Sequence, residues 1–180
     1  MVRVALVVGV GLVGFIVFQE VARTLETRAA VAMLRAFGSR RVVLATDTSI
    51  LVVPVNHGPF QAMVTPTCSS LSSLLAIASL GAICPPGHRR RLIAVTIASL
   101  TIVAGNVLRI AGSVAVGILA GRTSLILFHD WVGSVFAFGY TLVGYVLLLR
   151  LLLHRPSTEI TSPWTPATSK PSSAPQPVSP

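Results

Sequence analysis

Charged side chains are scarce in this sequence, and acidic ones are the scarcest. Only 11% of the 180 residues are charged and five are Asp or Glu, whereas an ordinary soluble domain carries about 25% charged residues. Hydrophobic residues make up 53% of the chain, which leaves too few polar residues to cover a surface that faces water. These proportions exclude an ordinary soluble domain and indicate that the surrounding solvent is a lipid bilayer.

Lysine is nearly absent, with one Lys against thirteen Arg, and the net charge is +9. The arginines stand beside apolar segments instead of along one soluble face, which argues against a nucleic-acid interface. Basic residues at the ends of apolar segments are typical of topology signals and of contacts with lipid headgroups. The predicted partner is therefore the lipid bilayer, with no nucleic acid.

Cysteine is equally rare, with only Cys68 and Cys84 in the chain. On one helix these two residues would lie about 24 Å apart, whereas a disulfide needs Cα atoms within about 7 Å. One cysteine with scattered histidines also lacks the paired spacing of zinc ligands. No glycine-rich phosphate-binding motif is present, so neither a metal nor another cofactor is expected.

Four apolar segments are each close to the length of about 20 residues that crosses a bilayer as a helix. The predicted spans are residues 4–21, 68–84, 92–112 and 131–153. The apolar stretch continues to residue 120, longer than a straight span needs, so a tilt or a break near Gly112 is expected. The fold class predicted is an all-α integral membrane protein with about four transmembrane helices, in a membrane domain of residues 1–155.

The segment between the first two spans, residues 22–67, is predicted to lie outside the cytoplasm. Apolar residues at helical spacing over 20–38 are typical of an amphipathic helix on the membrane surface or of a soluble connecting helix. Three β-prone runs then alternate with turn formers, which predicts a small extracytoplasmic β-unit. These runs are residues 42–45, 50–55 and 60–65.

The basic loop 85–91 is predicted to be cytoplasmic, and Arg3 and Arg155 agree, which places both termini in the cytoplasm. The stretch 20–41 carries five Arg against two Glu yet falls outside, because the charge rule weakens in long loops. The tail, residues 156–180, holds seven prolines with many Ser and Thr. This composition predicts a disordered cytoplasmic tail.

With this topology, Cys68, Arg109 and His129 all reach the outer face of the membrane. Cys68 begins the second span, and His129 with Asp130 precedes the fourth. Arg109 follows Leu92 by a helical rise of about 26 Å, in a hydrocarbon core of about 30 Å. Three reactive side chains that are distant in sequence are therefore expected near one another.

Together these residues have the chemistry of a thiol-based active site. A neighbouring cation favours the reactive thiolate, so Arg109 is a candidate to stabilise Cys68 or the oxyanion that forms when it attacks a carbonyl. Histidine is the side chain that ordinarily changes charge near neutral pH, so His129 is suited to move the proton to a leaving amine. Asn106, on the helix face of Arg109, and Asp130 are candidates to orient a partner by hydrogen bonding.

Plainer interpretations stand beside this one. Cys68 also fits a small buried residue at a helix start, and Arg109 fits a side chain that extends to lipid headgroups. His129 and Asp130 also fit a helix N-terminal cap. His57, in a turn with proline and glycine, is interpreted as structural.

Three motifs carry a resemblance to a known family: CSSL at residues 68–71, NVLRI at 106–110 and HDWVG at 129–133. Each motif stands before or within a successive span. Their order and placement resemble the exosortase/archaeosortase family, and the resemblance covers residues 42–153. The sequence departs from the family at Ser70, where Gly is expected, and has fewer spans than typical members. The resemblance implies a membrane-embedded cysteine protease or transpeptidase of the cell membrane, multi-pass, with its active site facing outside.

In this family, partner proteins are exported and carry a C-terminal motif, one membrane helix and a basic cluster. The resemblance assigns Cys68 as nucleophile, with Arg109 and His129 in the other two catalytic positions, and an acyl-enzyme that passes to water or to an acceptor amine or lipid. One alternative is a non-enzymatic assembly factor or degenerate family member. A small transporter is a further alternative, although apart from Asn106 and Arg109 the spans offer only Ser and Thr as a polar path.

Overall fold

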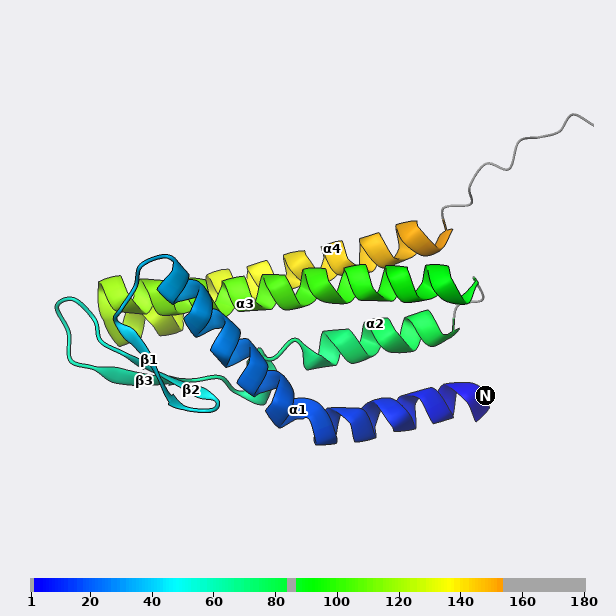
Figure 1. Cartoon of the computed structure of the whole chain (residues 1–180), viewed down its shortest axis with the longest axis horizontal. Helices are drawn as coiled ribbons and strands as arrows, with labels where there is room; N and C mark the ends of the chain where they lie inside the picture. Colours follow the sequence, from blue (N-terminus) through cyan, green and yellow to red (C-terminus); the bar gives the residue numbers. More distant parts are fainter. Residues whose placement is uncertain (1, 84–86, 154–180) are drawn as a thin grey trace, which may run out of the picture.

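The computed structural model describes residues 2–83 and 87–153, and it is mostly helical with one small sheet. Figure 1 shows the helices lying side by side, with the sheet at one end and the N-terminus at the other. We call these the sheet end and the basic end, since the basic run Arg89–Arg91 opens a helix at the latter. The helices are α1 (Val2–Ala36), α2 (Leu71–Ile83), α3 (His88–Leu127) and α4 (Gly133–Leu153). The tail predicted to be disordered lies outside the described residues.

One helical stretch among the described residues, Arg89–Leu153, is long and apolar enough to cross a membrane, and α2 is a shorter apolar helix. The long stretch reverses direction at Gly121, whose φ of 81° and ψ of −176° lie in a region that only glycine occupies readily. The ring of His57 packs against Gly121, 3.1 Å from where a Cβ would stand. The break expected at Gly112 is therefore wrong, because Gly112 lies within regular α3.

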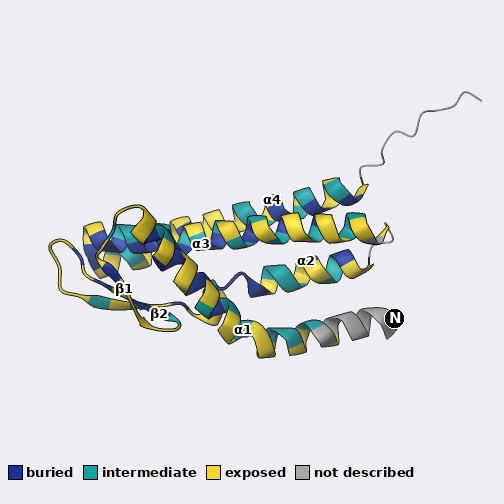
Figure 2. Cartoon of the chain, viewed as in Figure 1, coloured by how far each residue is buried: buried dark blue, intermediate teal, exposed yellow. Residues whose placement is uncertain are grey.

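Small residues let α3 and α4 approach closely after the reversal (Figure 1). A Cβ added to Gly105 would lie 2.5 Å from Cγ of Tyr140, and one added to Gly144 would lie 2.7 Å from Ile102. The outer faces remain apolar and exposed (Figure 2), as at Leu100 and Phe138. Large exposed apolar side chains along tightly packed helices are typical of surfaces that face lipid.

Helix α1 joins two segments that the sequence analysis treats separately, and Figure 1 shows it bent between them. In its C-terminal part the apolar residues are divided between two faces, because Val21 and Leu25 are exposed whereas Val31 and Leu34 are buried. The buried face mixes polar and apolar side chains, at positions three and four residues apart. These are Arg23, Glu26, Thr27, Ala30, Val31 and Leu34.

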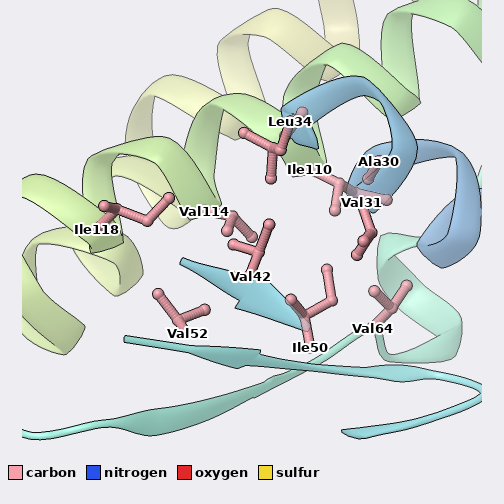
Figure 3. Packing of buried hydrophobic residues seen from close by; sticks show 11 residues of the cluster. Ala30, Val31, Leu34, Val42, Ile50, Val52, Val64, Ile110, Val114 and Ile118 are labelled. Carbon is pink, nitrogen blue, oxygen red and sulfur yellow. The ribbon is translucent and has the colours of Figure 1, made fainter. Parts of the chain in front are cut away.

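The predicted β-unit is confirmed as an antiparallel sheet of β1 (Val42–Thr46), β2 (Ser49–Val52) and β3 (Phe60–Met63), in that order. Val42 pairs with Val52, and Ile50 pairs with Ala62. One face of the sheet packs on α1 and on the sheet end of α3 (Figure 3). The apolar side chains that form this core are Ala30, Val31, Leu34, Val42, Ile50, Val52, Val64, Ile110, Ala111, Val114 and Ile118. This core fixes the place of the chain that follows β3.

Candidate active site

Cys68 lies in the short connection between β3 and α2, in a 3-10 turn formed by Pro66–Cys68. Its backbone N–H donates to the carbonyl of Thr65 at 3.0 Å. Its own carbonyl accepts a hydrogen bond of 2.9 Å from Nδ2 of Asn106, a fully buried residue of α3. Oδ1 of Asn106 in turn accepts from the hydroxyl of Tyr140 at 3.0 Å, so Cys68 is tied to both α3 and α4.

The sulfur of Cys68 is 3.1 Å from Nε2 of His129, which lies 61 residues further along the chain. His129 belongs to a π-helical turn, Phe128–Val132, between the reversal at Gly121 and α4. The hydroxyl of Thr65 is also 3.1 Å from the sulfur. The thiol therefore has an imidazole and a hydroxyl as hydrogen-bond partners.

Ser113 fixes the tautomer of His129. The Ser113 hydroxyl donates its proton to the carbonyl of Arg109 at 2.9 Å, so toward Nδ1 of His129, 3.4 Å away, its oxygen acts as acceptor. This arrangement favours the neutral tautomer with the proton on Nδ1, which leaves Nε2 as the acceptor that faces the thiol. This is the tautomer that a base acting on Cys68 requires.

Arg109 reaches the same place from α3, with one terminal nitrogen 3.4 Å from Nε2 of His129. Its Nε is buried and has no hydrogen-bond partner. The side chain crosses Gly133, where a Cβ would lie 3.0 Å from Nε. Within the described residues no carboxylate forms an ion pair with Arg109, so its charge is available to an anionic group.

Burial and hydrogen bonding act in opposite directions on the Cys68 thiol, which lies in the connection before α2. Burial raises its pKa, but the hydrogen bonds to His129 and Thr65, together with the positive charge that His129 carries when it is protonated, lower it more. The net result is a thiol pKa of about 7 in place of 9.0. More of the thiol is therefore ionised at neutral pH than in an ordinary cysteine.

An open cleft of about 510 Å³ leads to the sulfur and offers room for a substrate. Its lining comes from the chain before Cys68 and from the chain around the π-helical turn. The lining residues are Met63, Thr65, Thr67, Cys68, Arg109, Leu125, Ile126, His129, Asp130 and Ser134. A smaller apolar pocket of about 220 Å³, between Leu108 and Phe136, adjoins Arg109.

The structure brings together Cys68, Arg109, His129 and Asn106, which the sequence analysis singled out. Asp130 lines the cleft, and in the part of the chain that is described it makes no hydrogen bond to His129; Ser113 holds that position. The sequence reasoning missed Ser113, although its spacing from Asn106 and Arg109 places all three on one helix face. It also missed Thr65, Tyr140 and Glu26, for which no sequence signal was evident.

Comparison with known proteins identifies the family. A family profile described as transmembrane exosortase matches residues 3–148, which is most of the chain. No curated protein and no solved structure matches it. The profile covers the Cys68, Arg109 and His129 positions and the helices that carry them. The chain therefore belongs to the transmembrane exosortase family.

Proposed function

We propose that this protein is a sortase-like cysteine transpeptidase of the membrane, which cleaves the C-terminal sorting signal of exported proteins. The observation that carries the proposal is the 3.1 Å contact between the sulfur of Cys68 and Nε2 of His129. A thiol beside a base that is itself oriented by a third group is the arrangement of nucleophilic catalysis. Ser113 supplies the third group here.

In the first step, Nε2 of His129 takes the thiol proton and the thiolate attacks the carbonyl carbon of the scissile peptide bond. A carbon–sulfur bond forms, and the electron pair of the carbonyl moves to its oxygen. When the intermediate collapses, the carbon–nitrogen bond breaks and Nε2 returns the proton to the leaving amine. A thioester on Cys68 remains, which an acceptor amine or hydroxyl, or water, resolves with His129 again as base.

Arg109 is proposed to stabilise the oxyanion because four of the backbone N–H groups near Cys68 already have hydrogen-bond partners. The N–H groups of Cys68 and Ser69 donate to the carbonyls of Thr65 and Pro66. Those of Ser70 and Leu71 donate to side-chain oxygens. The guanidinium of Arg109 lines the cleft and, within the described residues, forms no ion pair with a carboxylate, and a charged donor in a partly dry site is effective.

The arrangement of the helices suggests how a membrane substrate would approach. The cleft lies at the sheet end, and the basic residues that open α3 lie at the opposite end (Figure 1). With the basic end in the cytoplasm, the multi-pass chain has about four spans, both termini inside and the cleft outside. A substrate helix in the bilayer would then present the residues that precede it to Cys68.

The test is a reporter made of an exported domain with a C-terminal motif, a membrane helix and a basic cluster, taken from the genome that encodes this chain. Co-expression with the full chain is expected to remove the helix and basic cluster, as read by intact mass of the reporter. A reporter that stays intact beside correctly inserted protein, for every such signal in the genome, would reject the proposal and favour a non-enzymatic assembly role.

A further inference from the structure

Glu26 is an unusual residue in this structure because it is an acidic side chain in the interior. It is 4% exposed, on the buried face of α1. The other acidic residues in the described part of the chain, Glu20, Asp47 and Asp130, are exposed. Burying a carboxylate destabilises a protein unless the carboxylate is well hydrogen-bonded. The contacts of Glu26 therefore indicate its role.

The contacts of Glu26 are made to the segment that carries the nucleophile. Its Oε1 accepts a hydrogen bond of 3.0 Å from the backbone N–H of Ser70 and a second one, of 2.5 Å, from the Ser70 hydroxyl. Its Oε2 is buried and has no partner. Ser70 stands two residues after Cys68, where the family resemblance leads us to expect glycine, and its hydroxyl gives Glu26 its second donor.

A second residue of α1 holds the other end of the same segment. Nε of Arg23 donates to the carbonyl of Val64 at 2.7 Å, and the hydroxyl of Thr27 donates to the carbonyl of Arg23 at the same distance. Arg23 and Glu26 are three apart and share the buried face of α1. Helix α1 therefore holds residues 64–70 at both ends, and Cys68 lies between the two contacts.

The connection needs this support because its own backbone bonds are few. Between Thr65 and Ser69 they amount to two single-turn contacts, Cys68 N–H to Thr65 O and Ser69 N–H to Pro66 O. The contact of the sulfur with His129 joins two segments far apart in the sequence, so a shift of the connection would lengthen it. A misplacement of about 1 Å is enough to cost a catalytic contact.

We propose that Glu26 is a positioning residue, which holds Cys68 against His129 by binding Ser70 through its carboxylate. This inference rests on the proposed function only for its consequence in catalysis, since the geometry of the thiol can be measured without a substrate. Arg23 supports the same segment from its other end. Helix α1, which carries no residue of the Cys–His–Arg trio, thereby becomes part of the catalytic apparatus.

When Glu26 is removed, the direction in which the thiol pKa of Cys68 moves distinguishes a positioning role from a purely electrostatic one. Loss of a nearby negative charge favours the thiolate and would lower the thiol pKa of Cys68. Loss of positioning would lengthen the contact between the Cys68 sulfur and His129 and so raise the thiol pKa. The other charged and titratable groups around the sulfur are His129, Arg109, Asp130 and Tyr140, and none of them is changed in the variants below.

The experiment measures the alkylation rate of Cys68 against pH in the full chain carrying Cys84→Ser, with Glu26→Ala, Glu26→Gln and Ser70→Ala compared. Glu26→Ala is expected to raise the thiol pKa by about one unit, which reduces the rate at pH 7 about fivefold and leaves it unchanged well above pH 9. Glu26→Gln keeps an acceptor for Ser70 and should restore most of the rate. Ser70→Ala keeps the N–H donor and should give a smaller rise.

Asp47→Asn is the matched control, because it removes an exposed acid that pairs with Arg28 and not with Arg23, and it should leave the profile unchanged. A thiol pKa that is unchanged or lowered in Glu26→Ala overturns the proposal. If Glu26→Ala fails to insert, Ser70→Ala provides the test. A pH profile of Ser70→Ala that matches the wild type would also overturn the proposal. Reporter processing is measured in parallel, so an inactive wild-type chain with the expected thiol shift refutes the proposed function and leaves this inference standing.

Discussion

Replacing Cys68 with alanine is expected to abolish reporter processing, a loss of about 10³-fold or more. Alanine has no nucleophile, and no other thiol lines the cleft. The sulfur is only half-buried, so the substitution removes little packing and the protein should still insert. The measurement is the fraction of reporter cleaved, read by intact mass at equal levels of membrane-inserted protein.

Cys84→Ala provides the control for general effects of removing a thiol, and processing by that variant should match the wild type. Cys68→Ser replaces the sulfur with a hydroxyl, which is far less ionised at neutral pH, and should be nearly as inactive as Cys68→Ala. Wild-type processing by Cys68→Ala would show that another residue performs the cleavage, and the enzymatic assignment of this site would be lost.

Arg109→Gln is expected to reduce processing by about 10²- to 10³-fold, the usual cost of losing one oxyanion donor. The loss should fall mainly on kcat, because the oxyanion exists only in the transition state and intermediate. Arg109→Lys keeps the charge but not the planar fork of donors, so it should recover only part of the activity. Initial rates of processing at saturating reporter give the kcat effect directly.

Arg122 offers the matched control, since it is exposed and lies next to the reversal at Gly121. Arg122→Gln should process the reporter at the wild-type rate. Because Arg109 lies against Gly133 in the interior, insertion and Cys68 alkylation are measured for each Arg109 variant. An Arg109→Gln protein that is inserted, alkylated normally and fully active would remove Arg109 from the mechanism.

The meeting of Cys68, Arg109 and His129 was predictable from the sequence because it depends on coarse features. Apolar segments of the right length and the position of the basic loop place all three at one end of the bundle. The three β-prone runs were also evident, since turn-forming residues separate them. These features depend on composition over many residues and tolerate errors in element boundaries.

The remaining details of the site depend on tertiary contacts. The sequence alone does not show which residues make those contacts. Gly112 and Gly121 look alike as candidate breaks, and only the packing of His57 and the positive φ identify Gly121 as the reversal. The buried face of α1 escaped prediction because two of its members are charged. Arg23 and Glu26 bind main-chain groups of a distant segment, and the periodicity of apolar residues cannot predict such contacts.

The sequence left two roles open for Arg109, stabilising the thiolate of Cys68 or the oxyanion, and the contacts favour the second. The hydrogen bonds that lower the thiol pKa come from His129 and Thr65, and Arg109 contacts the ring of His129. Arg109 is thus better placed for the charge that develops on the substrate than for the charge on the sulfur. This supports the proposed division of roles, in which His129 would activate the nucleophile and Arg109 would receive the oxyanion.

The pairing of Cys68 with His129 is tested most directly by titrating the Cys68 thiol through its alkylation rate, in wild-type protein and in His129→Ala, both carrying Cys84→Ser. A thiol pKa lowered to about 7 means that the thiolate is present above pH 7 and is lost as the pH falls below it. We expect half-maximal alkylation near pH 7 in the wild type and a shift to clearly higher pH in His129→Ala. Superimposable profiles for the two proteins, or a wild-type midpoint near 9, would contradict the pairing.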